Sequence, residues 1–342
     1  MKLLICTQAV DSRDSNLGFF HTWVEEFAKH CESVTVICLR EGEHSLPQNV
    51  QVLSLGKEQG KGRVVRVWRF LKYIRASNYD AVFVHMNPEY VLLGGRYWQG
   101  HGKKIGLWYA HKSVTWKLNY AVRLLDRVFT VSSNSFQIQT PKLRVLGHGI
   151  DTELFRPAMH TESNQLRIIT AGRLAESKRL LEMIAVLDVL HARGQKFSFT
   201  IAGEAGTPAE QAYTELLRAE IAKRPYQANV HLVGAVPHHE LADVLRKHDV
   251  QFNFGVTGNM DKAGLEALAA GIPLFSTNEH FRELLEPWGL YVGSPNAEVV
   301  ADALVQFFNR GDQPAIIATL RNKVVAEHSL TNLIPKILKE LV

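Results

Sequence analysis

The sequence predicts a doubly wound α/β protein made of two Rossmann-like domains. Short apolar segments typical of buried strands alternate with helical segments of about ten to fifteen residues, which is the pattern of a parallel sheet covered by helices. The alternation runs twice along the chain, and the polar stretch 152–165 between the two series has the composition of an interdomain linker. A length of 342 residues is enough for two domains of ordinary size.

The first series contains six apolar segments, each bounded by turn residues or by a helical pattern. They predict strands at 2–6, 34–39, 50–55, 81–84, 104–109 and 128–131. Helices are expected from Phe19, from Arg63 and after the Asn87-Pro88 turn. The series closes near Gly147-His148-Gly149, and we assign the first domain to residues 1–155.

The second series has five further apolar segments of strand length. They predict strands at 167–171, 197–202, 230–233, 250–254 and 273–275. The clearest helical patterns follow the strands or close the chain, at 178–192, 209–223, 297–309, 314–327 and 330–342. We assign the second domain to residues 156–328, and a ligand should bind where the carboxyl ends of the two sheets face each other across a cleft.

Composition and charge narrow the class of protein. A hydrophobic content of 46% and a charged content of 21% are typical of a soluble globular protein, and no apolar run approaches the roughly 18 residues of a membrane span. Three cysteines do not make a disulfide framework, and the N-terminal residues lack a signal-peptide pattern, so we predict a cytoplasmic protein. The net charge of +5 favours an anionic partner without choosing among nucleic acid, membrane and phosphorylated substrate.

The stretch Asn253 to Pro273 predicts an anion site. A buried strand ends near Phe254, a glycine-bearing loop follows, and a small-residue helix opens at Asp261 or Lys262. Free N–H groups and the helix dipole at such a helix start both favour an anion. Glu266, one turn into the helix, more plausibly accepts hydrogen bonds from hydroxyl groups, and a nucleotide offers both a diphosphate and ribose hydroxyls.

A second signal follows the first strand of the second domain. Gly172 and Arg173 follow that strand, and Lys178 comes at the start of the next helix. The side chains of Arg173 and Lys178 can therefore reach one diphosphate. This matters because the sequence has no Asp-rich metal motif to neutralise a leaving diphosphate. The alternative is that the two residues are ordinary solvated cations.

Four further positions follow predicted strands. Gly203 and Gly234 fit either plain turns or close approach of the backbone to a ligand, and a base could stack or pair against the loop at Gly234. In the first domain, Gly18 offers backbone N–H groups near a helix start. His111 follows the strand that ends at Tyr109, and only that position distinguishes it from a structural histidine.

The segment 57–75 is the most basic part of the chain. On a helix from Arg63, we expect Val64, Val67, Phe70, Leu71 and Ile74 to form one face and the basic residues to lie opposite. The basic face is either simply solvated or attracts an anionic membrane surface, at about 1 kcal/mol per basic residue. No RNA-binding motif or aromatic platform supports a nucleic-acid partner.

Taken together, these residues resemble the group 1 glycosyltransferases of the GT-B fold, which are similar to glycosyltransferase family 4. The resemblance extends over nearly the whole chain. It is carried by the segments Leu17–His21, Asp126–Ser132, Gly147–Asp151 with Phe155-Arg156-Pro157, Gly172–Leu174 with Ser177-Lys178, and Leu265–Pro273. Each motif alone is weak, but their order and spacing are specific.

The resemblance implies transfer of a sugar from a nucleoside diphosphate sugar, UDP- or GDP-linked, with retention of configuration and without a metal or other cofactor. Arg173 and Lys178 would hold the diphosphate, with Lys262 and the N–H groups of Ala263, Gly264 and Leu265 supporting the phosphates. Glu266 would bind the ribose, while Gly18 and His111 would lie near the sugar and the acceptor. The acceptor would be a glycan or a lipid-linked molecule in surface polysaccharide or glycolipid synthesis on the inner membrane face. The final helix, 329–342, would pack back on the first domain.

One position departs from the family pattern. The family has two glutamates eight positions apart, and counting back from Glu266 gives Gly258. Three explanations remain open: Asp261 replaces the missing carboxylate, the donor sugar is unusual, or activity is lost.

Two alternatives therefore stand beside a transferase: a degenerate partner or nucleotide-sugar sensor, and a GT-B sugar-nucleotide epimerase. An NAD-dependent dehydrogenase lacks support, because no G-x-G-x-x-G follows the first strand.

Overall fold

Two compact units make up the protein, and each contains one parallel sheet. The computed structural model describes residues 1–14, 17–158, 163–256 and 260–342. Unit 1 comprises Met1–Asp151, Pro237–His239 and Glu327–Val342, and unit 2 comprises Thr152–Val236 and Glu240–Ala326.

Unit 1 is built on a seven-stranded sheet of order β3-β2-β1-β4-β5-β6-β7, in which all neighbours are parallel. Its strands are β1 (Lys2–Val10), β2 (Ser33–Glu41), β3 (Val50–Ser54), β4 (Ala81–His85), β5 (Lys104–Trp108), β6 (Arg127–Thr130) and β7 (Leu143–Val145). Its helices are α1 (Phe19–His30), α2 (Arg63–Ala76), α3 (Pro88–Gly100), α4 (Trp116–Leu124) and α12 (Leu330–Lys339), with a 3-10 turn η1 (Ser133–Ser135). The short edge strand β7 was not predicted.

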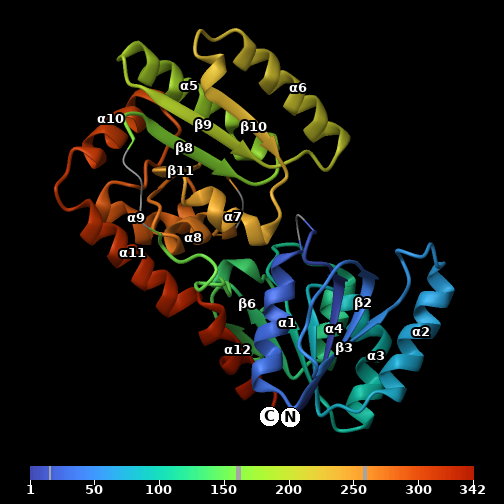
Figure 1. Ribbon diagram of the computed structural model, residues 1–342. Helices are drawn as coiled ribbons and strands as arrows, with labels where there is room; N and C mark the ends of the chain where they lie inside the picture. The colour runs from blue at the N-terminus through green and yellow to red at the C-terminus, as the bar shows by residue number, and fades with distance from the viewer. Residues whose placement is uncertain (15–16, 159–162, 257–259) are drawn as a thin grey trace. The chain divides into compact units, whose positions relative to one another are not determined.

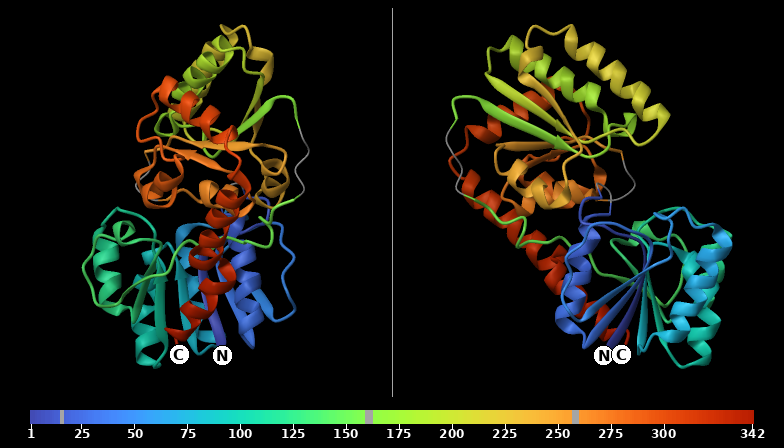
Figure 2. Two further views of the ribbon diagram at one scale, coloured as in Figure 1. Left: turned by 90° about the vertical axis from the view of Figure 1, so that its left-hand side faces the viewer. Right: turned by 45° about the vertical axis from the view of Figure 1, so that its right-hand side comes forward.

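Both faces of this sheet are covered, which is why its strands read as continuous apolar runs rather than alternating ones. On one face, Leu3 and Ile5 of β1 pack in a core with Trp23 of α1 and Ile334 of α12. On the other, Leu4 lies in the core that α2, α3 and α4 cover. Figures 1 and 2 show α12 beside α1, with the two chain ends close together at one edge of this unit.

Unit 2 is built on a five-stranded parallel sheet of order β10-β9-β8-β11-β12. Its strands are β8 (Leu166–Ala171), β9 (Phe197–Ala202), β10 (Val230–Gly234), β11 (Val250–Asn253) and β12 (Leu274–Ser276). The α-helices are α5 (Leu180–Ala192), α6 (Pro208–Ala222), α7 (His238–Leu245), α8 (Lys262–Ala269), α9 (Arg282–Leu285), α10 (Ala297–Phe308) and α11 (Gln313–His328). The 3-10 turns are η2 (Glu176–Lys178), η3 (Gln227–Asn229), η4 (Glu279–Phe281) and η5 (Glu286–Trp288).

The order of each sheet creates a switch point. The chain leaves β1 for β2 on one side and later returns to β4 on the other, so β1 and β4 flank the switch point of unit 1. In unit 2, β8 and β11 do the same. Ligands of doubly wound proteins bind at the carboxyl ends of such strand pairs.

Two sequence expectations about helices are wrong in detail. The helix predicted from Lys178 begins at Leu180, because Arg179 adopts a left-handed conformation with φ of 55° that separates η2 from α5. On α2, Val64 was expected on the buried face but is 84% exposed, and the residues buried there are Phe70 and Ile74. A helix face is buried only along the length over which the sheet lies beneath it.

Candidate functional site

Three glycine loops meet at the carboxyl edge of the unit 2 sheet. The Gly172 N–H donates to Ala202 O at 2.9 Å, and the Gly203 N–H donates to Gly234 O at 2.7 Å. A Cβ on Gly203 would lie 1.7 Å from Gly172 O, so no side chain fits at that position. Gly203 therefore allows the loops after β8 and β9 to pack backbone against backbone, which is a structural reason for a glycine there.

Arg173 leaves the end of β8 and is held by a buried carboxylate. Its Nη1 donates to Glu210 Oε1 at 3.0 Å, and Glu210 Oε2 accepts the Gly206 N–H at 2.8 Å. The Arg173 side chain is still 59% exposed, against 11% for Glu210. One edge of the guanidinium is thus fixed by Glu210 while much of the group faces water.

Lys178 forms an ion pair with Asp261, the residue that precedes α8. Asp261 Oδ2 also accepts a hydrogen bond from Asn253 Nδ2 at 3.2 Å, and Ser276 Oγ donates to Asn253 O at 2.9 Å. The network joins η2, β11, β12 and the start of α8. The structure therefore brings Lys178 and Asp261 together at the switch point, although the sequence analysis assigned them separate roles.

The N-terminus of α8 lacks the side-chain cap that an aspartate at this position usually provides. Asp261 makes no capping hydrogen bond to α8, because its carboxylate points to Lys178 and Asn253. The N–H groups of Gly264 and Leu265 donate to Asp261 O at 3.1 and 3.3 Å. The expectation that these two N–H groups face an anion is therefore wrong, whereas among the described residues the Ala263 N–H has no acceptor.

Gly264 has a packing role. A Cβ there would lie 2.7 Å from the Phe281 ring and 2.8 Å from Leu274, so the glycine lets α8 lie close against β12. Its predicted role in binding phosphate is thus replaced by a role in positioning the helix.

Lys262 and Glu266 lie one turn apart on α8, and residues so spaced are neighbours on a helix face. Glu266 is 5% exposed and Lys262 is half-buried. Burial lowers the pKa of Lys262 from 10.5 to about 7, although the charge of Glu266 acts in the opposite direction. A lysine held at this pKa can take up a proton when an anion binds beside it.

The predicted residues of unit 1 have local partners. The Gly18 N–H donates to Asp14 O at 2.8 Å, and a Cβ on Gly18 would lie 2.5 Å from the same oxygen. The prediction that this N–H is available to a ligand is therefore wrong. His111 is exposed and its Nδ1 accepts the Ser113 N–H at 2.9 Å. Gly258, where the family pattern has a glutamate, lies outside the described residues.

Three residues of the unit 2 site were missed by the sequence analysis. Glu210 lies three residues after Thr207, in the capping-box pattern of a helix start. That pattern is a sufficient reason for a glutamate there, so the sequence did not point to a role in a binding site. Asn253 is the last residue of β11, the strand that precedes the predicted anion site. A polar residue at the end of an apolar run was the feature by which the sequence could have identified it. Ser276, at the end of β12, carried no distinguishing signal.

Residues 151–319 match the family model described as glycosyl transferases group 1. The matched stretch is just under half of the chain, and over it the chain is similar to that family. Its fold is GT-B: HepE of Anabaena in complex with UDP-glucose aligns with a TM-score of 0.76 at 15% identity, covering 100% of this chain and 99% of that one. A glycosyltransferase from Rickettsia africae aligns with a TM-score of 0.74 at 15% identity, covering 99% of this chain and 97% of that one.

A curated sequence relative is the amylovoran biosynthesis glycosyltransferase AmsK of Erwinia amylovora. It is 29% identical over 198 residues, which cover 54% of this chain and 47% of AmsK. The match therefore spans about half of that relative. Among the helices that the structure describes, none is long and apolar enough to cross a membrane.

Proposed function

We propose that this protein transfers a sugar from a nucleoside diphosphate sugar to a glycan or lipid-linked acceptor in surface polysaccharide or glycolipid synthesis. The observation that carries the proposal is the start of α8, where the Asp261 carboxylate is turned toward Lys178 instead of capping the helix. The Ala263 N–H, which has no acceptor among the described residues, the positive end of the helix dipole and two lysines then surround one point.

In this proposal, Arg173, Lys178 and Lys262 bind the donor diphosphate. Arg173 presents the part of its guanidinium that Glu210 leaves exposed, and Lys178 shares its ammonium between Asp261 and a phosphate oxygen. Their charges stabilise the diphosphate as the bond to the sugar breaks, which is an electrostatic contribution to catalysis. The positive charge that the leaving group needs comes from side chains, so we propose a reaction that does not depend on a metal ion.

The nucleoside is proposed to lie along the same edge of the sheet. Glu266 accepts hydrogen bonds from the ribose hydroxyls, since a buried carboxylate beside an anion site is suited to hydroxyl donors. The base meets the loop at Gly234, where a Cβ would meet nothing within 4 Å, and the Gly203 N–H holds that loop in place through its hydrogen bond to Gly234 O. UDP and GDP are the candidate nucleotides, and UDP-glucose is present in the HepE complex.

We further propose that the reaction retains configuration, with Asp261 standing in for the carboxylate missing at Gly258 and His111 near the acceptor. The protein would work in the cytoplasm at the inner membrane face, where the basic segment 57–75 meets anionic lipid.

The test is nucleotide binding followed by product analysis. UDP-, GDP- and ADP-sugars are compared by thermal shift, because a ligand of the native state raises its melting temperature. The double variant Arg173→Ala, Lys178→Ala should bind the preferred nucleotide at least about a hundredfold more weakly, since each charged hydrogen bond contributes about 1.5–3 kcal/mol. The control Arg218→Ala, Lys223→Ala removes the same charge from α6 and from the residue that follows it, and should bind as the parent does.

Equal binding by the parent and the Arg173, Lys178 variant would refute the diphosphate assignment. Labelled donor incubated with membrane lipid extracts should give a labelled, lipid-extractable product. Its anomeric configuration, determined by NMR, decides between retention and inversion. Epimerised free nucleotide sugar formed without acceptor would favour an epimerase, and binding without any turnover would favour a sensor.

A further inference from the structure

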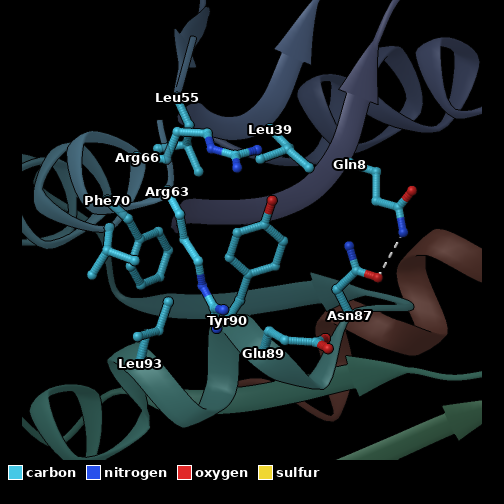
Figure 3. Close-up of a pocket in the computed structure, with 11 residues that line it drawn as sticks. Gln8, Leu39, Leu55, Arg63, Arg66, Phe70, Asn87, Glu89, Tyr90 and Leu93 are labelled. Carbon is cyan, nitrogen blue, oxygen red and sulfur yellow. Dashed lines mark hydrogen bonds between the residues drawn. The ribbon is translucent and has the colours of Figure 1, made fainter. Parts of the chain in front are cut away.

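Unit 1 contains a pocket of about 330 Å³ between α2 and α3 at the carboxyl edge of its sheet. Gln8 of β1, Leu39 of β2 and Asn87, which follows β4, form the side against the sheet (Figure 3). The pocket therefore lies beside the β1–β4 switch point, where doubly wound sheets bind ligands. Its volume is at the lower end for ligand sites, enough for a compact headgroup.

Two arginines of α2 give this pocket its charge. Figure 3 shows the side chains of Arg63 and Arg66 coming from α2 and facing the same space as the ring of Tyr90. In the part of the chain that the structure describes, neither guanidinium is paired with a carboxylate, and Arg66 Nε is buried without a hydrogen-bond acceptor. A buried N–H of a charged group without an acceptor is costly, so an anionic oxygen at this point would be stabilised.

The carboxylate in the pocket is already neutralised. Glu89 Oε1 accepts a hydrogen bond from Lys117 Nζ at 2.7 Å. Burial acts to raise the pKa of Glu89, but the hydrogen bond and charge of Lys117 outweigh it and lower the pKa. Glu89 therefore stays ionised and paired with Lys117, so Arg63 and Arg66 leave the pocket with a net positive charge.

Apolar side chains are also exposed at the pocket and elsewhere on α2. Leu93 of α3 lines the pocket and is 41% exposed, whereas Val64 and Trp68 of α2, 84% and 61% exposed, are not among the residues that line it. Buried Phe70 and Tyr90 continue the apolar surface inside, with ring centroids 5.4 Å apart. An exposed tryptophan and valine beside basic residues are characteristic of helices that lie in a lipid interface.

We propose that this pocket binds the phosphate or diphosphate headgroup of a membrane lipid, which serves as the acceptor of the proposed transfer. Arg63 and Arg66 hold the phosphate oxygens, and the apolar chain leaves the pocket past Leu93 into the lipid layer, which the exposed Val64 and Trp68 of α2 also contact. A free sugar phosphate would use only the arginines, and a neutral lipid only the exposed apolar side chains. A phosphorylated lipid uses both. The acceptor role rests on the proposed function, whereas the binding of the lipid does not.

The test measures binding of the full chain to phosphatidylcholine vesicles that carry either phosphatidic acid or phosphatidylglycerol at equal surface charge. Phosphatidic acid exposes a terminal phosphate, whereas phosphatidylglycerol does not. Arg63→Gln, Arg66→Gln should weaken binding to phosphatidic acid vesicles by about tenfold or more and reduce binding to phosphatidylglycerol vesicles much less. Val64→Ser, Trp68→Ser should weaken binding to both vesicles.

The matched control is Lys72→Gln, Arg75→Gln, which removes the same charge from α2 outside the pocket. It should weaken binding to both kinds of vesicle equally, since it lowers only the general attraction to a negative surface. If Arg63→Gln, Arg66→Gln and Lys72→Gln, Arg75→Gln weakened binding to phosphatidic acid vesicles equally, the assignment of the phosphate to this pocket would be refuted. A lipid ligand would be refuted if inorganic pyrophosphate displaced the chain from phosphatidic acid vesicles as effectively as added phosphatidic acid vesicles do.

Nucleotide binding separates this proposal from the proposed transferase function. Arg63→Gln, Arg66→Gln should keep the melting-temperature rise given by the preferred nucleotide sugar, because the donor residues lie in unit 2. This result also shows that the variant is folded. Selective loss of phosphatidic acid binding in a chain that binds no nucleotide sugar would support the pocket and refute the donor site.

Discussion

At the scale of single residues, the candidate site depends on charged groups whose environment changes what they do. Asp261 is an N-cap by position, yet its carboxylate binds Lys178 and Asn253 and leaves the helix uncapped. Lys262, next along the chain, is a lysine whose pKa lies near neutrality because its ammonium is buried. Residue type and spacing revealed the presence of these groups, whereas only their neighbours fix their protonation and pairing.

The depressed pKa of Lys262 predicts a pH-dependent affinity for the nucleotide. A diphosphate stabilises the charged ammonium and raises the pKa of Lys262, so binding takes up a proton above pH 7. The affinity should therefore fall as the pH rises from 7 toward 9, by up to about tenfold per pH unit. Calorimetric titration with UDP in two buffers of different ionisation enthalpy measures the proton uptake.

The control for this prediction is Lys262→Met, which keeps the bulk of the side chain and removes the titrating group. Its affinity should be weaker at pH 7 and nearly constant up to pH 9. A parent protein that takes up no proton on binding UDP at pH 8 would contradict the placement of Lys262 beside the diphosphate.

At the scale of elements, the site depends on backbone packing between neighbouring loops. Gly203 and Gly264 were candidates for contact with a ligand, but a side chain at either position would meet protein atoms. Gly203 lets two strand-end loops touch, and Gly264 lets α8 lie against β12. Both glycines therefore act on the site indirectly, by placing the loops and the helix that carry its charged residues.

Gly203→Ala should destabilise unit 2 and disturb the site together. The new Cβ would lie 1.7 Å from Gly172 O, so the loop that carries Arg173 must move. We expect a loss of about 1–3 kcal/mol in the free energy of unfolding and a clear loss of nucleotide affinity. Urea unfolding and thermal shift with UDP measure the two effects.

Gly206→Ala is the matched control, because its Cβ would make only an ordinary contact at 3.4 Å with Glu210 Oε2. It should change stability little. A Gly203→Ala protein as stable as Gly206→Ala, with unchanged nucleotide binding, would show that the two loops do not pack as described.

At the scale of the whole molecule, the two ends of the chain fold into the same unit. The C-terminal helix α12 supplies Leu333, Ile334 and Ile337 to the core that it shares with α1. Glu340 accepts a hydrogen bond from Arg144 Nε at 3.2 Å, which ties the last residues to β7. Unit 1 is thus completed only after unit 2 has been synthesised, and its stability depends on residues far away in the sequence.

Substitution in α12 should therefore affect unit 1 alone. Ile334→Ala removes a fully buried side chain and should lower the unfolding free energy of unit 1 by about 2–5 kcal/mol, whereas Lys336→Ala, on the exposed side of the helix, should have little effect. Scanning calorimetry with and without UDP identifies the unit 2 transition, because the ligand raises it. A unit 2 transition lowered as much as that of unit 1 would contradict the division into two units.

The amino-acid sequence by itself determined the fold class, the strands along most of their length and the positions of Arg173, Lys178, Asp261 and Lys262 near one edge of a sheet. These follow from local patterns, because hydrophobic period and strand-end position are properties of neighbouring residues. Only the tertiary structure decided that Asp261 pairs with Lys178, that Glu210 fixes Arg173, and that Arg63 and Arg66 face a pocket in unit 1. Those contacts join residues far apart in the chain, and no local pattern encodes which distant partner a charged side chain meets.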